Sequence, residues 1–143
     1  MTTNTTAFEP HPQLQKDTLP VCELPLCSVL LMNDARYPWV ILVPRIADLR
    51  EIWDLSGADQ ATLWREVTCT AEALQSFTKA DKMNVASIGN LVPQLHIHVI
   101  ARKVGDAVWP APVWGRGEAE PYVASAAARQ VEALRLTIGA RRS

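Results

Sequence analysis

The chain has 143 residues, the length of one ordinary domain, with 48% apolar and 20% charged residues. This composition excludes long disorder, and a formal charge of −1, from 14 basic and 15 acidic residues, argues against a dedicated nucleic-acid binder. No apolar run is long enough to span a membrane, and the first residues lack the pattern of a secretory signal. We therefore expect a cytoplasmic protein with a mobile polar arm at residues 1–12 and a single domain at residues 13–143.

The N-terminal third predicts one helical turn at residues 14–18, followed by three strands. Residues 19–26 contain two prolines, which remove ladder donors and place this strand near a sheet edge. Residues 27–32 and 39–43 are apolar strands, and the turn at residues 33–38 joins them in an antiparallel hairpin.

The three cysteines are an odd number and, without a secretory signal, are expected to be reduced thiols. Cys22 and Cys27 are close enough in sequence to suggest two metal ligands. Since no second Cys/His pair completes a zinc set, we favour the interpretation that they are small residues on neighbouring strands.

The period then changes from that of a strand to that of a helix. A short helix or turn is expected at residues 48–55, and Ser56 has the side chain of an N-cap for the helix that follows. Residues 58–79 predict an amphipathic helix without internal Gly or Pro, long enough to cross a whole sheet. Its predicted buried stripe consists of Leu63, Trp64, Val67, Ala71, Leu74 and Phe77.

The remaining segments predict two more strands and a second helix. The strands cover residues 82–87 and 94–101, and residues 109–115 predict a rigid extended segment because proline fixes φ. A helix is expected at residues 118–136, with Pro121 in its first turn. The order of strands, helix, strands and helix predicts an α+β fold, an antiparallel meander of about five strands with one long helix and a C-terminal helix.

Two of the three histidines stand in one tripeptide, His96-Ile97-His98. Side chains alternate between the faces of a strand, so Gln94, His96 and His98 form a row on one face, about 6.5–7 Å apart. The apolar residues between them point into the core. The third histidine, His11, lies in the arm and is interpreted as incidental.

Three interpretations of this row remain open. The histidines are ordinary polar residues on a solvated face, or two ligands of a metal ion, or a nucleophile with a neighbour that assists in proton transfer or phosphate binding. The preceding segment favours the third interpretation. Gly89 permits a close approach of the backbone to a ligand, and Asn84 and Asn90 offer neutral donors for an anion.

The segment NVASIGNLVPQLHIHVIAR, at residues 84–102, resembles the signature region of the histidine triad (HIT) nucleotide hydrolases and transferases, in which three histidines alternate with apolar residues. The hairpin LLMNDARYPWVILVPR resembles the nucleotide-base and ribose segment of that family. The likeness covers roughly residues 20–103. The segment WPAPVWG is similar to one in a bacterial branch often labelled as diadenosine-tetraphosphate-type hydrolases.

The resemblance implies a HIT-like fold and a role for each site residue. His96 matches the nucleophile, which attacks the α-phosphate of a nucleotide or dinucleoside polyphosphate and forms a covalent nucleotidyl-histidine that water hydrolyses. His98 matches the histidine that contacts the phosphate, and Asn33 the ribose-binding position, while Asn84 and Asn90 match polar positions around the phosphates. We expect a homodimer that binds a small nucleotide, without a cofactor or a metal.

The sequence departs from the family pattern at two places. Gln94 replaces the first histidine of the triad, and its amide forms hydrogen bonds but cannot shuttle protons. Ile46 and Ala47 follow Pro44-Arg45, where many members have a histidine. Because the nucleophile is kept, we expect catalysis with a changed rate or substrate preference. The alternative is a nucleotide-binding regulatory module with little or no turnover.

Four further residues have two interpretations each. Trp39 and Trp109 either stack on a base or pack at a hairpin end or a dimer seam. Arg45 and Arg102 either bind phosphate or are solvated.

Overall fold

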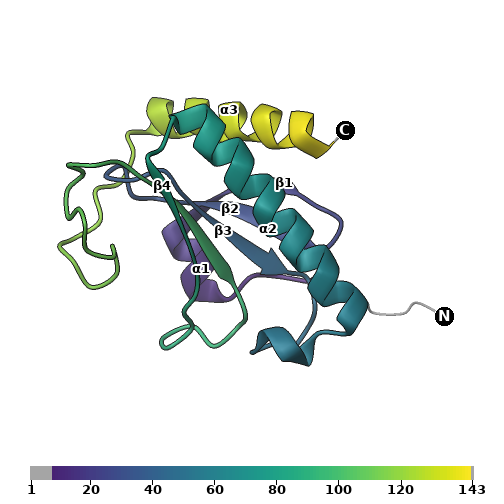
Figure 1. Cartoon of the computed structure of the whole chain (residues 1–143). Coiled ribbons are helices and arrows are strands. Elements are labelled where there is room, and N and C mark those ends of the chain that lie inside the picture. The colour runs from purple at the N-terminus through teal and green to yellow at the C-terminus, as the bar shows by residue number, and fades with distance from the viewer. Residues whose placement is uncertain (1–7, 143) are drawn as a thin grey trace.

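The computed structural model describes residues 8–142, so most of the arm predicted at residues 1–12 lies outside the described residues. In chain order the elements are α1 (Pro12–Asp17), β1 (Thr18–Glu23), β2 (Cys27–Met32), β3 (Trp39–Pro44), the 3-10 helix η1 (Ile52–Asp54), α2 (Gly57–Thr78), β4 (Lys82–Ser87), β5 (Ile97–Arg102) and α3 (Ala124–Arg142) (Figure 1). The predicted α+β class is confirmed.

Within residues 8–142, five strands form one antiparallel sheet in the order β1-β2-β3-β5-β4. The first three strands follow one another as a meander, and β1 is an edge strand as predicted. It ends at Glu23, so of the two prolines in the predicted strand at residues 19–26 only Pro20 lies in it. The last two strands depart from the meander, because β5 lies between β3 and β4. The long helix α2 carries the chain from β3 to the outer edge, where β4 begins, and β5 then returns to pair with both neighbours.

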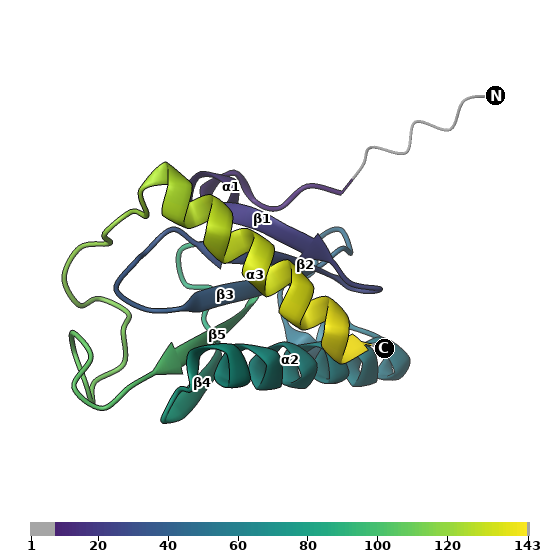
Figure 2. The same ribbon diagram turned by 90° about the horizontal axis from the view of Figure 1, so that it is seen from above.

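Helices α2 and α3 cover one face of the sheet (Figure 2), over a core that includes Leu63, Val67 and Leu74. Ser56 caps α2 by accepting a hydrogen bond from the Asp59 N–H, as predicted. The predicted stripe was wrong at two of its aromatic positions.

Trp64 and Phe77 of α2 do not belong to the buried stripe, because they are 42% and 40% exposed. Glu66 is buried in the same helix. Both carboxylate oxygens of Glu66 accept backbone N–H bonds of 2.9 Å, from Leu26 and Cys27. Periodicity cannot foresee this carboxylate, because the donors it satisfies belong to a distant turn.

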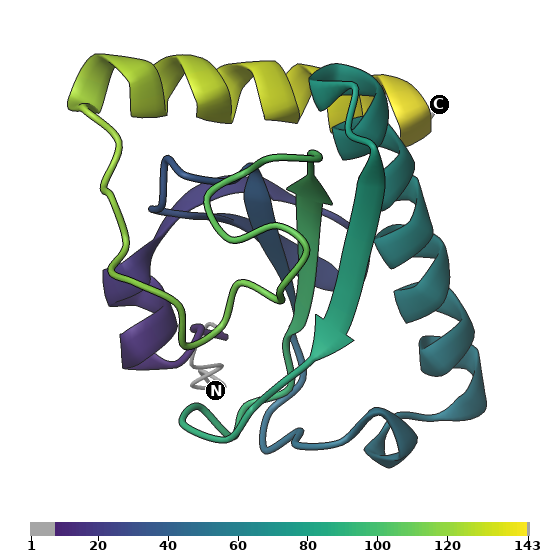
Figure 3. The same ribbon diagram turned by 60° about the vertical axis from the view of Figure 1, so that its left-hand side comes forward.

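The opposite face of the sheet is covered by α1, by the segment before it and by the connection between β5 and α3 (Figure 3). The buried residues of this second cluster are Leu14, Leu30, Tyr37, Trp39, Ile41, Val43, Val92, Ile100 and Val113. Residues 109–115 form turns, not the predicted extended segment, and Val113 is buried among them.

The predicted C-terminal helix is present, but it spans Ala124–Arg142, so its predicted bounds of residues 118–136 and the place of Pro121 in its first turn were wrong. The segment before it is held instead by the β2–β3 turn. The Tyr122 N–H donates to Asn33 Oδ1 at 2.9 Å, and the Ala35 N–H donates to the Glu120 carbonyl at 2.6 Å.

Cys22 lies on β1 and Cys27 on β2, so the interpretation as residues of neighbouring strands is confirmed. Among residues 8–142, no helix combines the length and the apolar character needed to cross a membrane.

Candidate functional site

The two adjacent histidines lie where β5 begins. The strand starts at Ile97, three residues later than predicted, because the Leu95 N–H donates to the Leu49 carbonyl at 2.8 Å instead of joining the ladder. The predicted alternation nevertheless holds. Leu95 and Ile97 are in the helix-covered core, and His96 and His98 lie on the other side at 4% and 5% exposure. The histidines therefore do not lie on a solvated face.

The ring of His96 is held by the backbone just before it. Its Nδ1 lies 2.7 Å from the Gln94 carbonyl oxygen, which can only accept, so the proton resides on Nδ1. Burial lowers the pKa of His96, the Gln94 carbonyl acts in the opposite direction, and the charge of His11 lowers it further. The ring is therefore neutral at pH 7, with an unprotonated Nε2 that can act as a nucleophile.

His98 has the opposite tautomer. The Trp39 indole Nε1–H donates to His98 Nδ1 at 3.1 Å, which leaves the proton of the neutral ring on Nε2. Burial and the neighbouring charge of His96 lower the pKa of His98 to about 4, against a smaller opposing effect of the Ile88 carbonyl. The two rings lie with their centroids 4.9 Å apart. One ring thus offers a lone pair and the other an N–H donor.

A second indole completes the surroundings of His98. The ring of Trp114 lies edge-on to His98 at 5.3 Å and to Trp39 at 6.1 Å between centroids. Its Nε1 is buried, and none of the described residues accepts a hydrogen bond from it. Trp114 comes from the connection after β5, so this connection forms part of the site.

Four of the predicted site residues meet in one cavity of about 180 Å³, here called the His96 cavity. Its lining residues are Arg50, Glu51, Ser87, Gly89, Asn90, Pro93, Gln94, Leu95 and His96. A Cβ atom on Gly89 would lie 2.9 Å from the Val92 carbonyl oxygen, so this turn requires glycine. Gly89, Asn90, Gln94 and His96 therefore border one small polar space.

Sequence reasoning missed Arg50 and Glu51 in the His96 cavity. They follow Leu49, whose carbonyl accepts the Leu95 N–H, and the Glu51 N–H donates to Asp54 Oδ2 at 3.0 Å. The only sequence signal was a pair of charges at the end of the loop after β3. No periodicity relates this loop to the histidines.

His11 was interpreted as an incidental residue of the arm, but it is bound to the domain. Its backbone N–H donates to Gln94 Oε1 at 2.7 Å, and its Nδ1 accepts the Gln13 N–H at 3.0 Å as the cap of α1. Phe8, three residues earlier, packs against the second cluster. The end of the predicted arm is therefore bound to the domain, next to the row of Gln94 and His96.

Asn33 lies apart from the His96 cavity, in a larger cavity of about 420 Å³ that we call the Asn33 cavity. Trp39 and Trp114 line it as well, so the indoles that contact His98 also form its wall. Asn33 Oδ1 accepts the Tyr122 N–H, which leaves the amide nitrogen of Asn33 as its donor toward a ligand.

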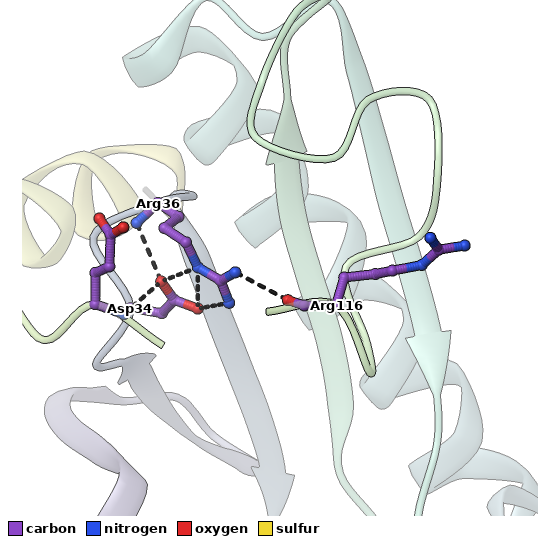
Figure 4. A network of polar contacts seen from close by, with 4 residues as sticks. Asp34, Arg36 and Arg116 are labelled. Atoms are coloured by element: carbon purple, nitrogen blue, oxygen red, sulfur yellow. Dashed lines mark hydrogen bonds and ion pairs between the residues drawn. The ribbon is translucent and has the colours of Figure 1, made fainter. Parts of the chain in front are cut away.

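The rim of the Asn33 cavity is stiffened by an ion pair (Figure 4). The Arg36 guanidinium donates to both oxygens of Asp34, with the closest N···O distance at 2.8 Å, and its Nη1 donates to the Arg116 carbonyl. Burial alone would raise the pKa of Asp34, but hydrogen bonds from Arg36 and from the Glu120 N–H lower it. The Arg116 side chain points away from this network.

Asn84 and the two arginines named from the sequence are engaged elsewhere. Asn84 Oδ1 accepts from Arg102 at 3.1 Å, and Arg102 is buried in an ion pair of 2.7 Å with Asp106. Arg45 pairs with Glu23 at 2.6 Å. None of the three lines the His96 cavity. Neither Arg45 nor Arg102 thus has a guanidinium available for phosphate there.

The donor set is that of an acid–base or nucleophilic site. Within the described residues, no group of three or more His, Cys, Asp or Glu side chains is arranged to hold a metal ion.

The family model for the HIT domain matches residues 13–105. A histidine triad protein of Bradyrhizobium japonicum is 47% identical, with a TM-score of 0.89 over 92% of this chain and 98% of that one. Histidine triad proteins of Marinobacter aquaeolei and Sinorhizobium meliloti are 43% and 42% identical, with TM-scores of 0.91 and 0.90. Each covers 94% of this chain, and this chain covers 98% and 99% of theirs.

No curated protein matches the chain. The matched region nonetheless includes the hairpin, α2 and the histidine segment, which is most of the domain. The protein therefore belongs to the histidine triad, or HIT domain, family.

Proposed function

We propose that this protein hydrolyses or transfers at the α-phosphate of a nucleotide or dinucleoside polyphosphate, with His96 as the nucleophile. HIT-domain proteins are generally nucleotide-binding hydrolases or transferases. The observation that carries the proposal is the 2.7 Å contact of His96 Nδ1 with the Gln94 carbonyl, because it leaves the Nε2 lone pair free to attack.

The reaction has two balanced steps. His96 Nε2 forms a bond to the α-phosphorus as the bond from that phosphorus to the leaving-group oxygen breaks. Water then attacks the same phosphorus and gives up one proton to the solvent. The phosphorus–nitrogen bond breaks, its electron pair returns to His96 Nε2, and the nucleoside monophosphate leaves. Gly89 and Asn90 of the His96 cavity hold the phosphate. The Nε2–H of His98 donates to one of the phosphate oxygens in place of the Ile88 carbonyl, which it faces in the free protein.

The nucleoside occupies the Asn33 cavity. Its volume of about 420 Å³ is in the range of small-molecule sites, and Asn33 binds a ribose hydroxyl through the amide nitrogen that Tyr122 leaves unused. Asn84 acts at a distance from the phosphate, by holding Arg102 on the same sheet face.

The direct test is to trap the intermediate. After incubation with diadenosine tetraphosphate and rapid acid-free quenching, mass spectrometry of peptides should find one adenylyl group on His96. H96N should form no adduct and release no AMP. An adduct on His98 would contradict the assignment of roles.

The same measurement decides between an enzyme and the alternative, a nucleotide-binding regulatory module. Gln94 in place of the first triad histidine is the observation that favours such a module. If the wild type binds AMP but neither turns over the dinucleotide nor forms an adduct, the module is the correct function.

The active form is a homodimer through β4. This strand is a sheet edge, and its Val85 is 43% exposed. An unpaired edge with an apolar side chain is a surface for pairing. Sedimentation should give twice the chain mass of 15.8 kDa, and V85K should shift the equilibrium toward monomer.

A further inference from the structure

Gln94 uses its whole amide to hold the segment before α1. Its Oε1 accepts the His11 N–H at 2.7 Å, and its Nε2 donates to the Glu9 carbonyl at 3.4 Å. The amide of Gln94 supplies both the acceptor and the donor of this pair of bonds. The amide at position 94 therefore binds the backbone of the segment before α1 at two points.

Other contacts fix the same segment. The Pro10 carbonyl accepts from Gln15 Nε2 at 2.6 Å, and the His11 carbonyl accepts the Gln15 N–H at 3.0 Å. The backbone of His11 is thus bound at both its N–H and its carbonyl. Because Gln94 also accepts from His96 at 2.7 Å, a single residue connects His11 to the nucleophile.

The imidazole of His11 is set in one tautomer. Its Nδ1 accepts the Gln13 N–H at 3.0 Å, so the neutral ring carries its proton on Nε2. The His11 backbone is bound to the side chain of Gln94, which lines the His96 cavity, so His11 lies next to that cavity. The charge of His11 also lowers the pKa of His96. His11 is only half-buried, so a ligand can reach it.

We propose that His11 supplies the third imidazole of this site, and that its Nε2–H donates to a phosphoryl oxygen of a nucleotide bound at His96. Gln94 is the positioning residue that fastens His11 there. This inference rests on the proposed function for the identity of the ligand. It restores a histidine donor that the sequence pattern lacks at position 94, from a different part of the chain.

The decisive variant is H11N. Asparagine keeps the backbone N–H for Gln94 and remains a strong N-cap for α1, so only the imidazole is lost. We expect AMP affinity and kcat/KM for diadenosine tetraphosphate to fall about tenfold or more, as for the loss of a hydrogen bond to a charged group. Q13A is the matched control, because the capping donor is a backbone N–H; it should behave as the wild type. Wild-type values in H11N would overturn the proposal.

The positioning role of Gln94 is tested by a double variant. AMP affinity and kcat/KM should fall about as much in Q94A as in H11N. They should fall no further in Q94A/H11N, because both changes remove the contact of the His11 imidazole with the phosphate. Losses that multiply would mean that Gln94 acts independently of His11 and would overturn its role.

A readout without nucleotide separates this inference from the proposed function. The pKa of His96, followed by NMR titration, should rise in H11N because the charge that lowers it is gone. It should be unchanged in Q13A. An unchanged His96 pKa in H11N would overturn the placement of His11 whether or not the wild type turns over, whereas absent turnover with the expected change would count only against the enzyme.

Discussion

Successive residues of β5 face two unlike environments. Ile97 and Val99 lie in the apolar core under α2 and α3, where any side chain of suitable volume satisfies the packing. On the opposite face, His98 and Arg102 are equally buried, but each polar atom has an assigned partner. On the helix-covered face, side-chain volume and packing stabilise the fold. On the opposite face, hydrogen bonds fix the orientation and protonation of the polar side chains. Substitutions on the two faces should therefore fail in different ways.

The largest effect is expected from breaking the buried ion pair of the polar face. Arg102 and Asp106 have side chains only 2% and 11% exposed, so R102M leaves a carboxylate unpaired and should cost about 4 kcal/mol of unfolding free energy. R45M is the control, because its partner Glu23 is 65% exposed and the loss should stay within about 1 kcal/mol. Urea denaturation measures both. Equal losses would show that burial does not distinguish the pairs.

On the helix face, L63A should destabilise by about 3 kcal/mol, because it opens a cavity at a fully buried position. W64A, one residue along α2 and largely exposed, should stay within about 1 kcal/mol. The activity per folded molecule should be unchanged in both variants, since neither residue lines the site. A loss of kcat in L63A at a temperature where it is folded would break the separation of the two faces.

The polar face should also make stability depend on pH. The pKa of His98 is lowered from 6.5 to about 4, so between these values only the unfolded chain binds the proton. The contribution of His98 to the unfolding free energy is therefore fully present above pH 6.5. It falls by about 3 kcal/mol as the pH drops from 6.5 to 4, and His98 causes no further loss below pH 4.

H98Q, which does not titrate, should reduce the slope of the unfolding free energy between pH 6.5 and 4 and leave only the part due to His96, whose pKa is also lowered by burial. The carboxyl groups with lowered pKa, Asp34 and Asp106, titrate below 3.8 and lie outside this window. The same slope in H98Q and in the wild type would refute the assignment to His98.

The smallest effect on stability, but a clear one on chemistry, is expected for W39F. The substitution keeps a ring against His98 but removes the N–H that holds Nδ1 as an acceptor. We expect kcat to fall about tenfold, with a stability change within about 1 kcal/mol, because the proton is no longer confined to Nε2. W109F, which keeps a ring under the Arg102 guanidinium, is the control and should leave kcat unchanged.

Elements with a strong period were predictable from the sequence. The hairpin, α2 and β4 fell within one or two residues of their predicted bounds, because alternation and helical spacing are local properties. The strand of the histidines began late, since the Leu95 N–H found its acceptor in Leu49, a contact distant in sequence. The start of the C-terminal helix was predicted too early for a similar reason. The residues around Pro121 are bound to the β2–β3 turn, which is distant in sequence.

Some residues of the candidate site could be named from the sequence and others could not. Gly89, Asn90, Gln94 and His96 were named from the sequence and share one cavity, because they are neighbours in a single loop. Arg50 and His11 were missed, since each reaches the histidines from another part of the chain. Asn33 was named correctly as a polar turn residue, but its own cavity is separate from that of His96.

The sequence by itself determined which residues alternate, and therefore that His96 and His98 leave the apolar core on the same side. It also indicated the family, through the histidine segment and the upstream hairpin, both of which lie in the region that the family model matches. Only the tertiary structure decided which nitrogen of each imidazole is free, because the partners are the Gln94 carbonyl and the distant Trp39 indole. Tautomers depend on hydrogen bonds formed in three dimensions, and no residue pattern encodes them.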